Sequence, residues 1–295
     1  MLERLQAWRR ARILERHAIT DDVWRHCVDQ LHVLDRLDDD EIATLRELVT
    51  LFMHQKTIVG AHELHVDDAM KITVAAQACL PILNLGLDYY RGWYTIILYP
   101  GAFVAHREVH DEDGLVHTGY EELDGESSEG GPVVLSWEEA KPLPADEVYN
   151  VVVHEFAHKI DESTGAPNGL PPLHSNMSIE TWSTVMTSAF DAFNAALERG
   201  EEPPFDDYAG TDPAEFFAVV SELFFAAPDV LVGAYPDVYA QLRAFFRQDP
   251  VAAYVQIEGA GGESTRIAGP SVLRSRRRVR QSGMWPSISR SKPRP

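Results

Sequence analysis

The sequence predicts an α+β fold in which helices surround a small mixed sheet. Apolar residues recur with helical spacing up to about residue 90 and again from about residue 145. Runs of β-branched and aromatic residues lie between these two regions, and helices and strands do not alternate along the chain. With 295 residues, 45% of them apolar and 24% charged, the chain can bury a large core.

Residues 1–90 are expected to form a helical N-terminal part. Acidic segments typical of helix starts, at 20–22 and 38–40, each precede an apolar periodic run. Residues 67–85 predict a long apolar helix that Pro81 ends or kinks.

The middle of the chain is expected to supply the sheet. Strands are predicted at residues 93–99, 103–109 and 132–137, where β-branched and aromatic residues cluster. The segment 111–131 is acidic and contains Gly and Ser, which predicts a loop.

Helices resume at about residue 145. The first is expected to end near Glu162, the second to span 179–197 and the third to begin at Pro213, with one or two more reaching about residue 254. Residues 259–295 are rich in Gly, Ser, Pro and Arg and have almost no periodicity, which predicts a disordered basic tail.

The net charge of −20 is unevenly distributed. Nine Lys and Arg residues against one acid give the tail +8, so residues 1–258 carry −28. So acidic a body repels nucleic acid, and we expect no nucleic-acid partner except for weak binding through the tail.

A cytoplasmic location is expected. No apolar run approaches the roughly 18 residues that a membrane helix needs, and the N-terminus lacks the pattern of a signal peptide. For the same reason we expect no membrane partner. Cys27 and Cys79 have no ligand-like spacing, so we expect two reduced, buried thiols.

The motif HEFAH at residues 154–158 carries the chemistry. In a helix, His154 and His158 lie one turn apart on one face, where both imidazoles can bind a single zinc ion. Glu155 is rotated from His154 by about 100°, so its carboxylate can take a proton from a zinc-activated water that attacks a carbonyl. The apolar neighbours predict a buried helix, in which such polar groups need a partner.

Asp161 lies three residues after His158, on the same predicted face. We expect its carboxylate to accept the ring N–H of a ligand histidine, as outer carboxylates do in zinc sites. The alternative is an aspartate near a helix C-terminus with no part in the site.

A site of this kind needs a third protein ligand. Thr164 stands where the metzincin pattern requires histidine, which excludes that class, and nothing favours His174. Glu215 has a slight advantage, although its place three residues after the N-cap Asp212 also suits a capping box. Glu222 shares its helix face and is the rival ligand.

Several segments together resemble the Mlc titration factor A family of zinc peptidases. The resemblance covers roughly residues 20–255 and is far more specific than the HExxH motif alone. In the family's order, the segments are AAQACLPIL at 75–83, IILYPGAF at 96–103, GPVVLSW at 131–137, VVVHEFAHKID at 151–161 and DPAEFFAVVSELFF at 212–225.

The resemblance implies a zincin-like catalytic part at residues 91–258 that packs with residues 1–90 as one unit. It implies one zinc ion per chain, held by His154, His158 and Glu215. Glu222 is then expected to be an outer carboxylate.

The catalytic domain of anthrax lethal factor is also similar, and this similarity implies a second catalytic residue. Tyr208, seven residues before Glu215, would stabilise the transition state. A phenol near the metal can donate a hydrogen bond to the developing oxyanion.

The resemblance implies a metalloprotease, and more narrowly an aminopeptidase, with a glucose-type (Mlc-like) transcriptional repressor as a further partner. A peptide substrate is expected to pair with residues 131–137 as an edge strand. The alternative is a non-catalytic protein that sequesters a transcription factor, with zinc structural or vestigial. Intact Glu155 and Tyr208 argue against it, because a structural site needs no general base.

Overall fold

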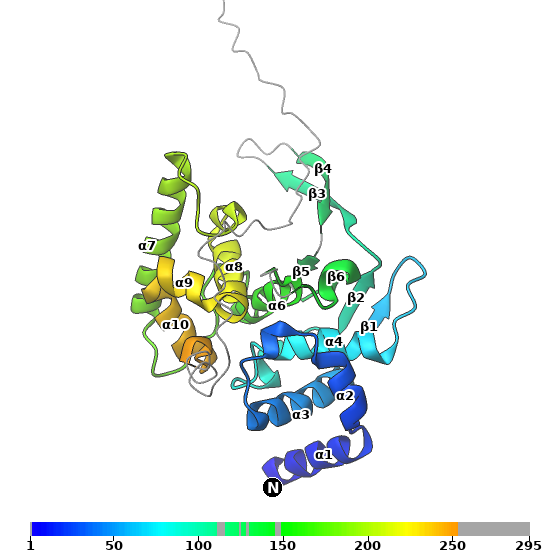
Figure 1. Ribbon diagram of the computed structural model, residues 1–295. Helices are drawn as coiled ribbons and strands as arrows, with labels where there is room; N and C mark the ends of the chain where they lie inside the picture. The colour runs from blue at the N-terminus through cyan, green and yellow to red at the C-terminus, as the bar shows by residue number, and fades with distance from the viewer. Residues whose placement is uncertain (1, 111–115, 124, 128–129, 145–148, 253–295) are drawn as a thin grey trace, which may run out of the picture.

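The computed structural model, which describes residues 2–110, 116–123, 125–127, 130–144 and 149–252, has two groups of helices and a small sheet that meet at helix α6 (Figure 1). Helix α6 lies between α4 of the N-terminal group and α8 of the C-terminal group. The N-terminal helices are α1 (Leu2–Arg16), α2 (Asp21–Val28), α3 (Asp39–Gln55) and α4 (Asp68–Cys79), with the 3₁₀ segments η1 (His32–Leu34) and η2 (Leu87–Tyr90). The others are α5 (Trp137–Ala140), α6 (Val151–Asp161), η3 (Glu162–Thr164), α7 (Ile179–Glu198), η4 (Asp207–Gly210), α8 (Pro213–Ala226), α9 (Pro228–Ala234) and α10 (Pro236–Phe246).

The sheet has four strands in the order β1-β2-β6-β5. Strands β1 (Thr57–Gly60), β2 (Thr95–Tyr99) and β6 (Val133–Ser136) are parallel, and β5 (Gly125–Ser127) runs antiparallel to β6. The segment 131–137 is therefore not the edge strand that the sequence predicted. Strand β6 is paired on both sides, and β5 lies at the edge of the sheet next to it.

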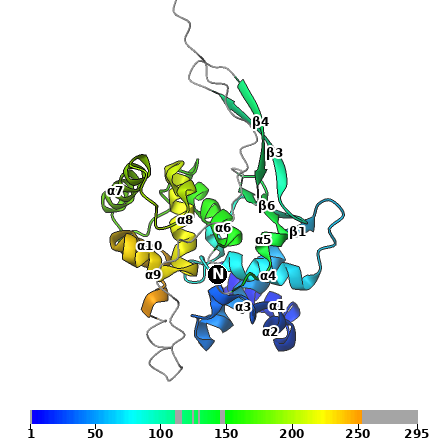
Figure 2. The same cartoon turned by 45° about the horizontal axis from the view of Figure 1, so that its top comes forward.

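A β-hairpin projects from the rest of the molecule (Figure 2). It consists of β3 (Phe103–His110) and β4 (Val116–Leu123), which pair antiparallel with Phe103 opposite Leu123. The prediction of a loop over residues 111–131 is wrong at 116–123 and 125–127, which form β4 and β5. Neither strand has an apolar run, so only pairing with β3 and β6 reveals them.

The N-terminal part also differs in one element from the all-helical prediction. Strand β1 is only four residues long, and it pairs in parallel with β2 across α4. This βαβ unit was not expected, because so short a run carries little sequence signal. The α+β class with a small mixed sheet is nonetheless confirmed.

Local capping signals explain where several helices begin and end. At the start of α3, the Asp38 carboxylate accepts the Glu41 N–H at 2.8 Å, and the Glu41 carboxylate accepts the Asp38 N–H at 3.1 Å. Helix α4 ends at Cys79, before Pro81, as predicted. Helix α6 begins at Val151, later than predicted, because the Asn150 side chain caps it by accepting the Val153 N–H at 2.9 Å.

A continuous apolar core runs through both groups of helices and fixes α6 in place. Phe156 is fully buried on α6, with its ring centroid 5.9 Å from Phe52, 5.1 Å from Tyr90 and 5.6 Å from Trp93. Such aromatic contacts add to the stabilisation from burial itself. The core therefore anchors α6 through the side chains that do not face α8.

Both cysteines are buried free thiols, as predicted. No helix in the described ranges is long and apolar enough to cross a membrane. The predicted tail at 259–295 lies outside the described residues.

Candidate metal centre

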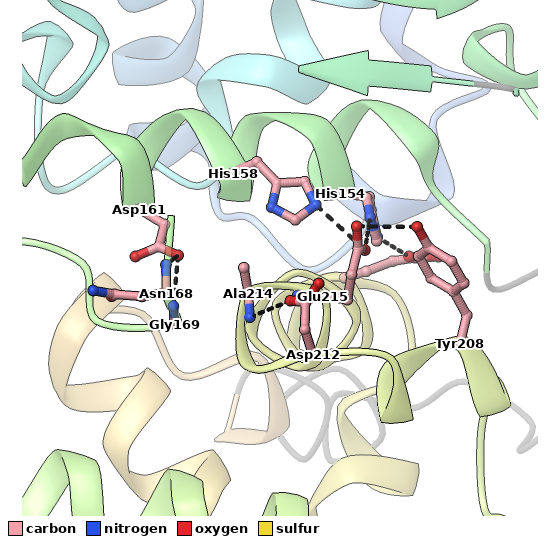
Figure 3. Close-up of polar contacts among 10 residues, drawn as sticks. His154, His158, Asp161, Asn168, Gly169, Tyr208, Asp212, Ala214 and Glu215 are labelled. Carbon is pink, nitrogen blue, oxygen red and sulfur yellow. Dashed lines mark hydrogen bonds and ion pairs between the residues drawn. The ribbon is translucent and has the colours of Figure 1, made fainter. Parts of the chain in front are cut away.

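Helix α6 carries two histidines on the face that meets α8 (Figure 3). The ring centroids of His154 and His158 lie 5.0 Å apart, as expected for side chains one helical turn apart. The side chain of His154 is 1% exposed and that of His158 is 12% exposed. Both imidazoles are therefore largely shielded from solvent, and that of His158 is the more exposed of the two.

Glu215 enters the site from the first turn of α8. The Asp212 side chain caps this helix by accepting the N–H groups of Ala214 at 2.8 Å and Glu215 at 3.0 Å. The Glu215 carboxylate faces α6, where its Oε2 lies 3.1 Å from His154 Nε2 and 3.4 Å from His158 Nε2. Glu215 thus points at the histidines, in contrast to the capping-box alternative.

These three side chains fit a metal ion. One ligand atom from each of His154, His158 and Glu215 lies within 4.8 Å of the other two. A tetrahedral ion with bonds of about 2.0–2.1 Å holds its ligand atoms roughly 3.3 Å apart. The distances from the Glu215 oxygen to the two ring nitrogens match this spacing, and the donor set is one that zinc prefers.

The protonation state of Glu215 also suits a metal ligand. Burial raises the pKa of its carboxyl, but hydrogen bonds and positive charge from His154 and His158 outweigh burial and hold the pKa well below its usual range. In the metal-free site the carboxylate is therefore an anion held by the two imidazoles, and a bound metal ion would replace their protons as its positive partner.

Glu222, the rival third ligand, contacts the same imidazole from the other side. Its Oε2 lies 3.4 Å from His154 Nδ1, and its Oε1 accepts the Asn150 N–H at 2.7 Å. Glu222 therefore binds the start of α6 by a hydrogen bond and lies within ion-pair distance of His154. Asn150 was missed in the sequence, although an Asn directly before the apolar start of a helix is a usual capping signal.

Tyr208 lies beside Glu215 (Figure 3). Its hydroxyl donates a hydrogen bond to Glu215 Oε1 at 3.0 Å. The Asp206 side chain accepts the Tyr208 N–H at 2.9 Å, which fixes the start of η4. The structure therefore brings together the tyrosine and the glutamate that the sequence placed seven residues apart.

Glu155 lies where the sheet meets α6. Its side chain is buried, and the backbone of β5 passes so close that a Cβ on Gly125 would lie 2.5 Å from Glu155 Oε1. Gly125 therefore leaves room for the carboxylate beside the edge strand. No sequence signal pointed to Gly125, because the contact joins a loop-like segment to a helix far along the chain.

Asp161 does not have the predicted partner. Its Oδ2 accepts the N–H groups of Asn168 at 2.8 Å and Gly169 at 2.6 Å, and its Oδ1 has no hydrogen-bond partner in the described part of the chain. Figure 3 shows the carboxylate pointing away from the histidines. The Asp161 carboxylate therefore does not accept the ring N–H of His158. Backbone N–H groups of the loop after η3 bind its Oδ2 instead.

His174 is also outside the site. Its Nε2 lies 2.8 Å from the carbonyl oxygen of Phe245 in α10, and the two rings lie 5.8 Å apart. The side chain therefore has a packing role between the loop and α10.

With this geometry established, comparison with known proteins defines the family. The sequence profile of the glucose-regulated metallo-peptidase M90 family matches residues 5–247. The chain belongs to this family. Members of this family are metallopeptidases, so the family implies a metal ion. His154, His158 and Glu215 could hold it.

Curated relatives of this M90 protein bear the name Mlc titration factor A, which confirms the resemblance seen in the sequence. The chain is 38% identical to the protein of Pectobacterium atrosepticum over 78% of its own length and 87% of the relative's. It is 38% identical to that of Edwardsiella ictaluri over 76% and 87%, respectively. It is 33% identical to that of Escherichia fergusonii over 79% of its own length and 89% of the relative's.

Proposed function

We propose that the protein is a zinc-dependent peptidase in which His154, His158 and Glu215 hold the ion and Glu155 is the general base. The observation that carries the proposal is the convergence of two ring nitrogens on one Glu215 oxygen, at 3.1 and 3.4 Å. Bound there, zinc would act as a Lewis acid and lower the pKa of a coordinated water toward about 7.

The remaining steps belong to side chains of the chain itself. Glu155 accepts the proton of the attacking water and later returns a proton to the leaving amine. Tyr208, whose hydroxyl already reaches the Glu215 carboxylate, donates a hydrogen bond to the oxyanion that develops on the scissile carbonyl.

The peptide substrate would pair with β5 instead of the segment that the sequence suggested. Strand β5 is at the edge of the sheet, and its Gly125 backbone lies against Glu155. An extended peptide added to this edge would pass the proposed base, and its main chain could form hydrogen bonds with β5.

We propose aminopeptidase specificity from the family resemblance. The rates of hydrolysis of peptides with free and with blocked N-termini test this specificity.

Glu155→Gln tests the chemistry. The variant should keep its fold and one zinc per chain but lose peptidase activity by several orders of magnitude, because an amide cannot accept the proton. The measurements are metal analysis and hydrolysis of a peptide library. Glu180→Gln, at an exposed position on α7, is the matched control and should behave as wild type. An active Glu155→Gln protein would place the base elsewhere.

The name of the relatives supports a second activity. They are called Mlc titration factor A, so we propose that this protein also binds a glucose-type transcriptional repressor in the cytoplasm. Purified repressor and Glu155→Gln protein should form a complex by size-exclusion chromatography. If wild type binds repressor but hydrolyses no peptide better than Glu155→Gln, the protein is the non-catalytic sequestrant instead.

A further inference from the structure

We infer that the loop 165–173 is a spacer that sets the distance between α6 and the first turn of α8, with Asp161 and Gly169 as positioning residues for Glu215. The inference rests on the proposed function, because it concerns how the third ligand reaches the histidines. It gives Asp161 a role in the site that acts through backbone contacts and not through an imidazole.

Asp161 fixes the loop to the end of α6. The side chain is fully buried, and its Oδ2 accepts two consecutive backbone N–H groups, those of Asn168 and Gly169. The Asn168 side chain in turn accepts the Leu170 N–H at 3.0 Å. A carboxylate that accepts several N–H groups is a strong anchor, since charge-assisted hydrogen bonds exceed neutral ones in strength.

Gly169 then meets both of the other helices. Its carbonyl oxygen accepts the indole N–H of Trp182 in α7 at 2.8 Å. A Cβ on Gly169 would lie 2.6 Å from the carbonyl oxygen of Pro213, the first residue of α8. Trp182 is 1% exposed, and its ring also packs 6.0 Å from that of Phe217 in α8. One loop residue is thus held by α6 and α7 and lies against α8.

The position of Gly169 matters because Pro213 lies two residues before Glu215. Any shift of this first turn moves the Glu215 carboxylate relative to His154 and His158, which lie on α6. Two features require glycine at position 169. Its φ is +79°, which other residues rarely adopt, and no space is left for a side chain.

Gly169→Ala tests the inference, and Gly165→Ala is its matched control. Gly165 begins the same loop with φ of +136°, but a Cβ there meets nothing within 4 Å. Both variants strain the backbone, and only Gly169→Ala presses on α8. Zinc dissociation constants would be measured on full-length protein by competition with a chromophoric chelator, beside thermal unfolding of the metal-free forms.

Gly169→Ala should weaken zinc binding about 10- to 100-fold, the usual effect of disturbing groups that support metal ligands. Gly165→Ala should stay within about threefold of wild type, whatever its loss of thermal stability. Unchanged zinc affinity in Gly169→Ala, or equal weakening in Gly165→Ala, would overturn the inference.

Trp182→Phe keeps the test decisive if Gly169→Ala does not fold. It removes the indole N–H that holds Gly169 and retains an aromatic ring, and it should weaken zinc binding by a smaller factor. Wild-type affinity in Trp182→Phe would count against the spacer. Failure of the wild-type protein to bind zinc would instead remove the proposed function itself.

Discussion

Helices α6 and α8 supply the candidate metal centre in different ways. Helix α6 presents His154 and His158 four residues apart, so the helix alone sets their separation. Helix α8 supplies Glu215 from 61 residues beyond His154, and no local geometry fixes that approach. It also supplies Glu222, two turns further on, which contacts the opposite nitrogen of the His154 ring.

The two helices also differ in how deeply the side chains of the proposed ligands are buried. The His154 side chain is 1% exposed, while that of Glu215 is 17% exposed. Phe156 anchors α6 among buried rings, whereas the first turn of α8 meets the loop around Gly169. The two histidines are therefore placed by short-range geometry and deep packing, and Glu215 by contacts between distant segments.

Removal of a ligand from each helix should produce the largest effects. Zinc sites bind with about 10–16 kcal/mol, so each ligand contributes on the order of 3 kcal/mol, roughly a hundred- to a thousandfold in affinity. His154→Ala and Glu215→Ala should both lose zinc to that extent by chelator competition.

Thermal unfolding of the metal-free variants then distinguishes the two helices. His154→Ala should also lower the melting temperature, because it leaves a cavity and a buried Glu222 carboxylate without its imidazole. Glu215→Ala should not, since its side chain is closer to solvent. Equal destabilisation by both would contradict the difference in packing drawn above.

Tyr208→Phe should reduce kcat about 10²- to 10³-fold, the usual effect of removing one oxyanion donor. Zinc affinity should change little, because the phenol contacts Glu215 and is not itself a proposed ligand. Steady-state kinetics and chelator competition check the two halves of the prediction. A loss of zinc affinity as large as the loss of kcat would make Tyr208 a support for Glu215 and not a catalytic residue.

Glu222→Ala should weaken zinc binding about 10- to 100-fold, less than Glu215→Ala, because it removes a support for His154 and leaves all three proposed ligands. Glu222→Gln retains an oxygen for the Asn150 N–H and should lose less. Chelator competition on both variants measures the difference. If Glu222→Ala released zinc as fully as Glu215→Ala, the two glutamates would exchange roles.

Deletion of residues 259–295 should have the smallest effect, on zinc content and on hydrolysis of small peptides alike. The segment has almost no apolar periodicity, so it can contribute little core. Any contact of its +8 charge with the acidic body should weaken as salt rises. A loss of thermal stability on truncation that persists at high salt would show instead that the tail packs into the fold.

The sequence by itself determined the features that depend on near neighbours in the chain. Helical spacing predicted that His154 and His158 share a face, and the acidic segment at 38–40 and Pro81 marked where helices begin and end. These signals are local, because a helix repeats every few residues regardless of its surroundings.

Only the tertiary structure decided which distant groups meet. Glu215 and Glu222 share one face of α8, and the offset between the packed helices puts one at Nε2 and the other at Nδ1 of the same imidazole. The same packing turned Asp161 toward the loop and placed β5 at the edge of the sheet. Sequence periodicity specifies which side chains share one face of a helix or strand. How far two helices are offset along their axes, and which strands pair, follows from how the whole core fills space.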